Sequence, residues 1–407
     1  MIKKVTIGVQ YLDTYPEKRN IVNIISNVNY VSVEDWYRKL ANLKIKLRSY
    51  TRLKRSLGGL IAKKDLDRYS FYLPNKDNEI NFFHFFNTIN LKAKQPWGVT
   101  FEATLPHFPP FSDYHKDDFP GGNKKALRKI KKYLKALADD KCKFIIALSN
   151  CNYKIQESLL SNFPEYKFVI EKKIQQIHPP QKVLLNSFSE KESINGKVNF
   201  VFVGRDLLGK GGGEVIKVFS RLINQYSNFH LYLIGDFQLN SVTAKDFTKN
   251  DVIEFKRFIE ENKKDVTYFP FLENKDLLEL LRDKIHVGML PTRADTYGYS
   301  VLEFQAAGCA VVSTGLRALT EINNEDIGWL INVKTNEFGE SFHYNKEQLK
   351  KLSVDIEKGL EECIISILKN PNQIIEKQRL SLERIKMMHN VDNYRDKLKD
   401  IYNDFIE

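Results

Sequence analysis

Residues 286–321 read HVGMLPTRADTYGYSVLEFQAAGCAVVSTGLRALTE, and this stretch decides the fold prediction. Val287–Leu290 is a short apolar run that predicts a buried strand, and Pro291 ends it. A polar loop with Asp295 and Gly298 follows the strand. The stretch therefore begins as a strand whose carboxyl end leads into a loop.

A helix and a second strand complete the stretch. Ser300 is suited to cap a helix that carries Glu303, and Gly308 ends that helix before the strand at residues 310–314. In an open α/β sheet, ligands bind outside the carboxyl ends of the strands, and a helix N-terminus favours anions. The carboxylates of Asp295 and Glu303 can accept hydrogen bonds from hydroxyl groups. The stretch thus favours a polyhydroxylated, phosphorylated ligand such as a nucleotide-sugar.

The stretch resembles the donor-site signature of the family 4 glycosyltransferases, which are retaining enzymes of the GT-B fold. That signature places seven residues between two acidic residues, as between Asp295 and Glu303 here. The first acid is Asp instead of the family's usual Glu, which shortens its reach by one methylene group. The other matching positions are Pro291, Thr292, Tyr297, Gly298, Ala306, Ala307, Gly308, Val311 and Val312.

The resemblance implies an α/β protein of the GT-B type, in which two Rossmann-like, doubly wound parallel-sheet domains face each other across a cleft. A length of 407 residues suits two domains. Strands and helices alternate in both halves, which also predicts parallel, doubly wound sheets. We expect an acceptor-side domain over residues 1–180, a nucleotide-sugar domain over 181–380, and a helix over 381–407 that crosses back to the first domain. Two prolines near residue 180 suit a linker.

Strands are predicted in the first half at residues 5–9, 80–86, 98–101 and 144–148. In the second half they are predicted at 198–203, 229–234 and 266–269, besides the two of the opening stretch. Helices are predicted at 124–137, 214–226 and 274–281.

A second motif follows the strand at residues 198–203. That strand ends in Gly204 and Arg205, and a glycine-rich turn with Lys210 precedes the next helix. Backbone amides in such a turn can approach an anion, although the turn is neither a Walker P-loop nor a clean dinucleotide fingerprint. By resemblance, Arg205 and Lys210 hold the donor pyrophosphate; the alternative is a loop with two solvated cations.

The family's reaction implies roles for these groups. Fixed cations and helix amides stabilise the charge that develops on the departing phosphate, so we expect neither a metal nor another cofactor. Asp65 and Asp67 have a metal-motif spacing but lie in a basic helical run, which favours a solvated helix face. By resemblance, Glu303 binds the ribose hydroxyls and Asp295 the donor sugar. The alternative for Glu303 is a first-turn acid favoured by the helix dipole. By the same resemblance, Gly204 and Gly298 belong to the donor-site loops, and the backbone amides of Tyr299 and Ser300 are expected to contact the β-phosphate.

The first half contributes candidates on the acceptor or sugar side. Glu102 stands where the family strand ends in a catalytic-site histidine, and His107 follows five residues later. His84, in an apolar strand, matches another histidine of the family. For His107 the alternative is a structural role, and for His84 it is a hydrogen-bonded histidine of the core.

The net charge of +12 comes mainly from two basic segments, residues 38–68 and 124–141. No aromatic-basic RNA motif or zinc finger accompanies them, so we expect no nucleic-acid partner. Residues 40–64 are basic and amphipathic, which fits either an anionic membrane surface or a solvated helix whose leucines face the core. The four cysteines lack a paired spacing, no run of about eighteen apolar residues is present, and the N-terminus reads as a strand instead of a signal peptide. We therefore expect a cytoplasmic protein, with a peripheral place on the inner face of the plasma membrane left open.

The sequence thus predicts a retaining hexosyltransferase that moves a sugar from a UDP- or GDP-sugar to a glycan or lipid-linked acceptor. The Lys/Asn/Ile-rich composition suggests a role in bacterial surface polysaccharide or glycoconjugate synthesis. Two alternatives remain: a GT-B binding or scaffold protein without transfer activity, and a nucleotide-sugar epimerase. The combination of Arg205 and Lys210 with Asp295 and Glu303 argues against the epimerase.

Overall fold

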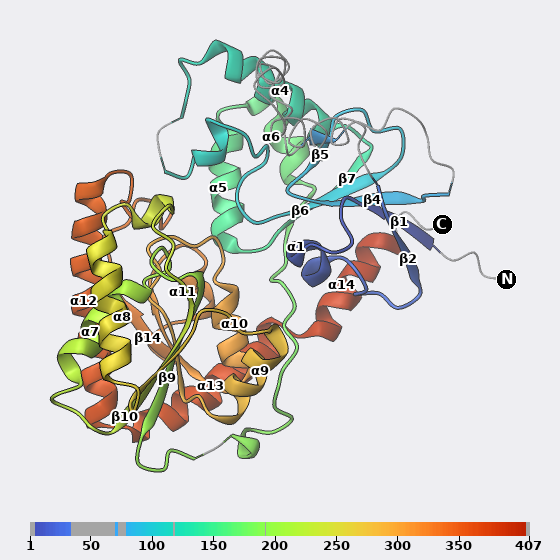
Figure 1. Ribbon diagram of the computed structural model, residues 1–407. Coiled ribbons are helices and arrows are strands. Elements are labelled where there is room, and N and C mark those ends of the chain that lie inside the picture. The colour runs from blue at the N-terminus through green and yellow to red at the C-terminus, as the bar shows by residue number, and fades with distance from the viewer. Residues whose placement is uncertain (1–4, 34–69, 72–78, 117–118, 192, 404–407) are drawn as a thin grey trace, which may run out of the picture. The chain divides into compact units, whose positions relative to one another are not determined.

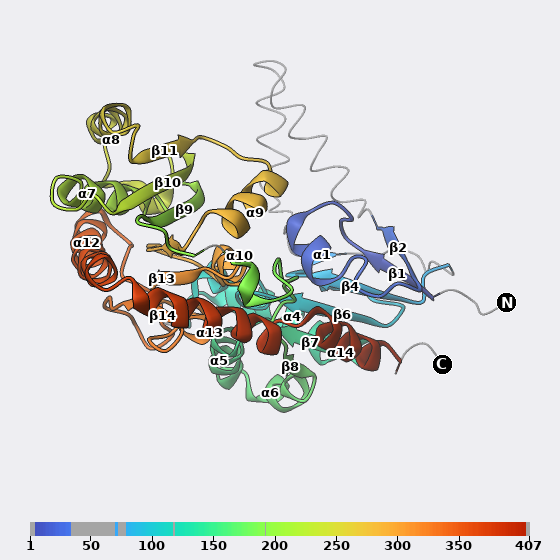
Figure 2. The ribbon, with the colours of Figure 1, turned by 90° about the horizontal axis from the view of Figure 1, so that it is seen from below.

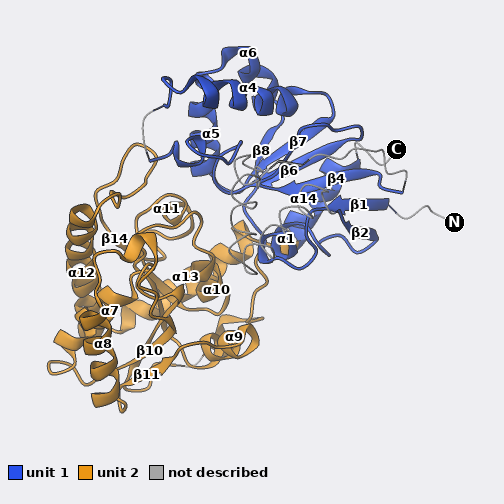
Figure 3. Cartoon of the chain, turned by 45° about the horizontal axis from the view of Figure 1, so that its top comes forward, with its two compact units in different colours: residues 1–180, 392–407 blue, residues 181–391 orange. Residues whose placement is uncertain are grey.

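The computed structural model describes residues 5–33, 70–71, 79–116, 119–191 and 193–403. The predicted amphipathic stretch at 40–64 and the Asp65/Asp67 pair lie outside the described residues. The chain divides into two compact units, shown in different colours in Figure 3. Unit 1 holds residues 1–180 and 392–407, and unit 2 holds residues 181–391.

Unit 1 is built on a sheet of six parallel strands in the order β2-β1-β4-β6-β7-β8 (Figure 1). The strands are β1 (Val5–Val9), β2 (Val28–Ser32), β4 (Phe82–Phe86), β6 (Trp97–Phe101), β7 (Cys142–Ala147) and β8 (Ile174–Gln176). A separate two-stranded sheet pairs β3 (Ser70–Phe71) with β5 (Ile89–Asn90). The helices among the described residues of this unit are α1 (Tyr15–Asn20), α4 (Lys124–Ala138), α5 (Asn150–Ser161), α6 (Pro164–Glu171) and α14 (Val391–Asn403).

Every residue of β4 and β6 is buried, as expected for central strands of a parallel sheet that is covered on both faces. The C-terminal helix α14 contributes to this core, because Tyr402 packs edge-on against Phe82. Helix α4 is amphipathic, with Ile130, Leu134 and Leu137 among its buried residues. The core of unit 1 is therefore assembled from both ends of the chain.

Unit 2 repeats the plan with six parallel strands in the order β11-β10-β9-β12-β13-β14. The strands are β9 (Val198–Asp206), β10 (Phe229–Asp236), β11 (Val266–Phe269), β12 (Val287–Leu290), β13 (Ala310–Thr314) and β14 (Gly328–Ile331). The helices are α7 (Gly212–Leu222), α8 (Lys249–Glu261), α9 (Asn274–Asp283), α10 (Tyr299–Ala306), α11 (Leu319–Ile322), α12 (Lys346–Lys369) and α13 (Asn372–Met388).

Helices flank both faces of the unit 2 sheet (Figure 2). On one face, Phe200 of β9 and Met289 of β12 share a core with Phe219 of α7 and with side chains of α8 and α12. On the other face, α10 packs so closely that a Cβ at Gly288 would lie 2.3 Å from the Phe304 ring. The predicted doubly wound parallel sheets are thus confirmed in both units.

One local prediction is wrong. Ser300 does not cap α10, because the N-cap is Gly298 and Ser300 is the second residue of the helix. Gly298 has a φ of +90°, a left-handed conformation that favours glycine. A Cβ at Gly298 would also lie 2.3 Å from the Leu319 side chain, so packing and backbone both require glycine there.

Candidate functional site

The candidate site lies at the carboxyl edge of the unit 2 sheet. Because β9 and β12 are parallel neighbours, the turn after β9 and the loop after β12 emerge at the same edge. The turn at residues 207–211 is closed by Asp206, whose carboxylate accepts the N–H of Gly209 at 3.0 Å. The backbone carbonyl of Asp206 accepts the N–H of Lys210 at 3.0 Å. The turn therefore brings Lys210 back toward the sheet edge.

The turn and the loop approach each other at backbone contact. Gly211 has a φ of +90°, and a Cβ there would lie 1.9 Å from the carbonyl oxygen of Pro291. A side chain at Gly211 would push the two segments apart. Gly204 plays a related part, since a Cβ there would lie 3.0 Å from Cβ of Lys210. Gly211 thus permits close packing of the two motifs, and the predicted donor-site residue Gly204 permits close packing within the first motif.

An ion pair joins the two motifs. Nζ of Lys210 donates to Oδ2 of Asp295 at 2.7 Å and to the carbonyl of Ala294 at 3.0 Å. Oδ1 of Asp295 accepts the N–H groups of Gly298 at 2.9 Å and Tyr297 at 3.2 Å. An ammonium group has three donors, so one donor of Lys210 remains beyond these two bonds.

Asp295 is held as a carboxylate. Burial alone would raise its pKa, but the charge and hydrogen bond of Lys210, with the N–H groups of Tyr297 and Gly298, outweigh burial and lower the pKa. Its side chain keeps 17% of its surface exposed. Asp295 is therefore a partly accessible acceptor that also fixes the shape of loop 291–298.

Helix α10 begins directly after this loop. Gly298 is the N-cap of α10 and has no side chain that could accept a hydrogen bond from the first turn. The first N–H groups of a helix have no intrahelical acceptor. The first turn, with Tyr299 and Ser300, thus presents the positive end of the helix dipole at the sheet edge. Glu303 is half-buried and is the fifth residue of α10. It lies beyond the first turn, so the alternative account of Glu303 as a first-turn acid is wrong.

Arg205 supplies a second cation at this edge. It is the penultimate residue of β9, and its side chain is exposed. Within the part of the chain that the structure describes, no carboxylate forms an ion pair with its guanidinium. The carboxyl ends of two adjacent strands therefore carry two cations, a carboxylate and a helix N-terminus: Arg205, Lys210, Asp295 and the start of α10. These groups suit a phosphorylated, hydroxyl-bearing ligand.

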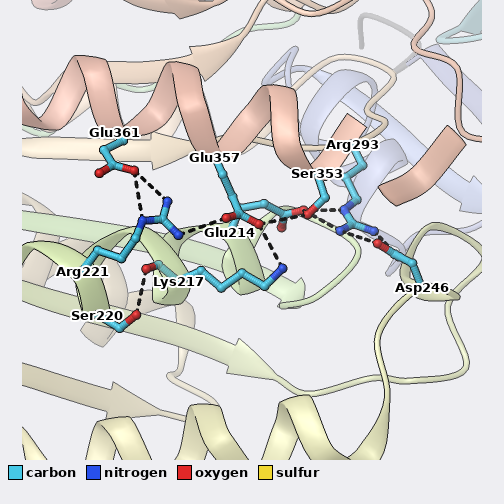
Figure 4. A network of polar contacts seen from close by, with 9 residues as sticks. All are labelled: Glu214, Lys217, Ser220, Arg221, Asp246, Arg293, Ser353, Glu357 and Glu361. Atoms are coloured by element: carbon cyan, nitrogen blue, oxygen red, sulfur yellow. Dashed lines mark hydrogen bonds and ion pairs between the residues drawn. The ribbon is translucent and has the colours of Figure 1, made fainter. Parts of the chain in front are cut away.

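A buried charge network lies behind loop 291–298 (Figure 4). Arg293 has no exposed surface; its Nε donates to Glu214 of α7 at 2.8 Å, and its Nη1 pairs with Asp246. Glu214 also accepts a hydrogen bond from Ser353 of α12 at 2.8 Å. Burial would lower the pKa of Arg293, but Glu214 and Asp246 raise it. The guanidinium therefore stays charged and ties the loop to α7, to the segment before α8 and, through Glu214, to α12.

This network was not predicted from the sequence. Its signal was Glu214, which lies four residues before Val218 and so falls on the buried face of α7. A buried carboxylate needs a cationic or hydrogen-bonding partner. The partner could not be identified from the sequence, because Arg293 is 79 residues away.

Glu102 is anchored at the carboxyl edge of the unit 1 sheet. Glu102 follows β6, and its N–H donates to Oδ1 of Asn87, the residue after β4, at 3.1 Å. Asn87 has a φ of +53°. Nearby in the sequence, Thr88 donates to the side chain of Gln10, which follows β1, at 2.8 Å. Polar side chains therefore follow three neighbouring strands of this sheet, with Glu102 among them.

The two histidines differ. His84 has no exposed surface, and its ring nitrogens contact the hydroxyls of Tyr402 at 2.6 Å and Thr100 at 2.7 Å. Burial lowers the pKa of His84 to about 3. This geometry favours the alternative of a neutral, hydrogen-bonded core histidine. His107 is half-buried in the segment after β6.

The described ranges contain neither a cluster suited to a metal ion nor a helix suited to span a membrane. No group of three or more His, Cys, Asp or Glu side chains in those ranges is placed to hold a metal ion. In the same ranges, no helix combines the length and apolar character needed to cross a bilayer.

Comparison with known families identifies the domain that carries the site. Residues 186–342 match the family described as Glycosyl transferases group 1, and this span includes both motifs. An uncharacterized 41.2 kDa protein in the cps region of Klebsiella pneumoniae is 23% identical over 222 residues. That match covers 54% of this chain and 56% of the relative, so it spans about half of each protein.

Solved structures match over nearly the whole chain. HepE from Anabaena, crystallised with UDP, has a TM-score of 0.58 at 11% identity and covers 98% of this chain and 100% of its own. A glycosyltransferase from Rickettsia africae has a TM-score of 0.56 at 14% identity, with 99% of both chains covered. Sucrose-phosphate synthase from Thermosynechococcus elongatus has a TM-score of 0.52 at 14% identity, with 98% and 88% covered. These likenesses confirm the predicted two-domain α/β fold of the GT-B type.

Proposed function

We propose that this protein is a retaining glycosyltransferase of family 4, which transfers a hexose from a nucleotide-sugar to a glycan or lipid-linked acceptor. One observation carries the proposal most directly. Lys210 and Asp295, which come from two motifs 85 residues apart, are joined beside the start of α10 in the domain that matches Glycosyl transferases group 1. A solved relative in fold, HepE, binds UDP.

The donor's diphosphate is proposed to meet the cations of this edge. Arg205 is exposed, and Lys210 retains one donor after its bonds to Asp295 and Ala294. The N-terminus of α10 adds backbone N–H groups and a favourable dipole. Together these groups supply positive charge without a metal ion, so we propose metal-independent binding of a UDP- or GDP-sugar.

The donor's hydroxyl groups are proposed to meet the two carboxylates. Asp295 accepts three hydrogen bonds within the protein, whereas a carboxylate offers about four acceptor sites. It can therefore accept a sugar hydroxyl without giving up its loop contacts. Glu303 is proposed to accept hydrogen bonds from the ribose.

In the proposed reaction, the bond between the anomeric carbon and the phosphate oxygen breaks, and its electron pair stays on that oxygen. Arg205, Lys210 and the α10 amides stabilise this developing charge. The acceptor hydroxyl forms the new bond on the same face of the sugar, and its proton passes to the departing phosphate. This course retains the anomeric configuration and requires no protein nucleophile. Glu102 is proposed to orient the sugar or the acceptor hydroxyl.

The acceptor class is proposed as a glycan or a lipid-linked glycan in surface polysaccharide or glycoconjugate synthesis. The relative encoded in a cps region supports this setting. We further propose that the protein acts in the cytoplasm.

A panel of nucleotide-sugars tests the proposal. The purified protein is incubated with each donor, with and without EDTA, and release of nucleoside diphosphate is measured beside thermal shifts with UDP and GDP. We expect release with at least one donor, unaffected by EDTA. A thermal shift without release or transfer from any donor and acceptor would instead favour a binding protein without transfer activity. Neither a shift nor release would refute the proposed donor site.

A further inference from the structure

The solvent face of helix α4 in unit 1 is entirely basic. Six residues of this helix are exposed, and all six are Lys or Arg. Neither the first turn nor any later position of the helix carries an acid. The exposed residues are Lys124, Lys125, Arg128, Lys131, Lys132 and Lys135. Four of them recur at helical spacing (residues 124, 128, 131 and 135) and so form one stripe.

An apolar patch lies next to this stripe on helix α6, which packs beside α4 (Figure 1). Lys131 of the stripe pairs with Glu165 in the first turn of α6 at 2.9 Å. Phe168 and Val169 lie three and four residues after Glu165, and so on the same side of α6. Phe168 is 66% exposed and Val169 is 42% exposed. Large apolar side chains therefore project beside the basic stripe.

A further base adjoins the apolar patch. Nζ of Lys172 lies 3.9 Å from the centre of the Phe168 ring. The nearest acids in the sequence, Asp139 and Asp140, follow the end of α4, and the exposed acid Glu165 of α6 pairs with Lys131, so none of them interrupts the other three bases of the stripe. The surface thus combines a row of cations with an exposed aromatic ring and its own neighbouring cation.

We propose that the α4/α6 surface docks on an anionic lipid membrane. Bases are attracted to anionic headgroups, while Phe168 and Val169 can enter the boundary between headgroups and acyl chains. A nucleic acid would use the bases but would give no apolar environment to Val169. The inference rests on the proposed function in one respect: a membrane-held acceptor would explain why a sugar-transferring protein carries such a surface.

Vesicle partitioning tests the surface. The full-length protein is sedimented with vesicles of phosphatidylcholine alone and of phosphatidylcholine mixed with phosphatidylglycerol. We expect binding to the mixed vesicles only. Each base near an anionic surface contributes about fivefold to partitioning, so K124Q/R128Q/K135Q is expected to bind on the order of a hundredfold more weakly. Phe168→Ser is expected to weaken binding without a change in charge.

A matched control separates this surface from general charge attraction. K346Q/K350Q/K351Q removes three exposed bases from α12 of unit 2 and so changes the net charge equally. This control is expected to bind nearly as well as the wild type. Equal losses in both triple variants, no binding to mixed vesicles, or equal binding to neutral vesicles would each overturn the proposal.

Two further measurements make the outcomes distinct. If single-stranded DNA binds the protein as tightly as the mixed vesicles, and K124Q/R128Q/K135Q weakens both equally, the surface is a nucleic-acid site and the membrane proposal fails. Thermal shifts with UDP and GDP are recorded for the same variants. If the protein binds vesicles but neither binds nor turns over a nucleotide-sugar, the membrane proposal holds and the proposed function is refuted. Donor turnover without vesicle binding would do the reverse.

Discussion

Replacement of Arg293 by Met is expected to destabilise unit 2 strongly. The guanidinium has no exposed surface and lies between Glu214 and Asp246, which are also buried (Figure 4). Met removes the charge while leaving an apolar side chain in the space. Removing one partner of a buried ion pair costs about 3–5 kcal/mol. Two carboxylates lose their cation here, although protonation of either would limit the penalty, so we expect a loss of at least about 3 kcal/mol.

Urea denaturation measures this loss. The background W36F/W97F leaves Trp329 of β14 as the only tryptophan of the chain, so its fluorescence reports on unit 2. The matched control is Arg221→Met. Arg221 pairs with Glu357 and Glu361, but its side chain is 41% exposed, so its ion pairs contribute about 1 kcal/mol or less.

The difference in unfolding free energy between the two variants tests whether Arg293 is a buried charge that fixes loop 291–298. A loss for Arg293→Met no larger than that for Arg221→Met would contradict the assignment of a buried, loop-fixing charge. Adding Glu214→Met to Arg293→Met should recover part of the stability, because one stranded carboxylate is then replaced by an apolar group. If Glu214→Met lowers the unfolding free energy by the same amount in the wild type and in Arg293→Met, the two residues are not coupled.

Three other changes test separate parts of the structure. Lys210→Met removes a charge-assisted contact worth about 1.5–3 kcal/mol, so calorimetry should show that UDP or GDP binds at least about tenfold more weakly. The control Lys197→Met breaks the Lys197–Asp265 ion pair of the same unit and should leave nucleotide affinity unchanged. Equal losses of affinity in the two variants would contradict the proposed donor site. Gly211→Ala meets both a positive φ and a backbone carbonyl, whereas Gly196→Ala meets a positive φ and nothing within 4 Å. Thermal denaturation should therefore show a larger loss for Gly211→Ala, by about 1 kcal/mol or more, and equal losses would refute the close approach. Folding lowers the pKa of His84 from 6.5 to about 3, so between these pH values the unfolded chain binds a proton at His84 that the folded chain does not. The free energy of unfolding should therefore fall by a few kcal/mol as the pH drops from 6.5 to 3. A His84→Asn variant whose stability has the same pH dependence as the wild type would contradict this prediction.

The strands of unit 2 could be predicted well because their ends carry strong local signals. Val287–Leu290, Ala310–Thr314 and Val266–Phe269 are apolar or β-branched runs, and the structure has strands at these bounds. Pro291 ends the first of them, since proline cannot continue a ladder of hydrogen bonds. Local chemistry alone thus determines where these elements begin and end.

Features that depend on distant residues could not be predicted. Ser300 is a favourable helix-capping residue type, yet the N-cap of α10 is Gly298 and Ser300 is the second residue of the helix. Glycine is required at that N-cap because Leu319, a distant residue, packs where a Cβ would lie. The contact of Lys210 with Asp295 joins motifs that the sequence indicated separately. The ion pair between Lys210 and the Asp295 carboxylate could not be predicted from the sequence, which indicated only that Lys210 faces a phosphate. His84 could be either a core or a site residue until Tyr402, 318 positions later, was seen beside it.

Release of nucleoside diphosphate tests the central claim most directly. Wild-type protein, Lys210→Met and Glu303→Gln are each incubated with a panel of nucleotide-sugars, and unchanged circular dichroism shows that the variants remain folded. We predict that the wild type releases nucleoside diphosphate from at least one donor and that both variants lose this turnover. Turnover near the wild-type rate in Lys210→Met and Glu303→Gln would contradict the assignment of the donor site to the ends of β9 and β12.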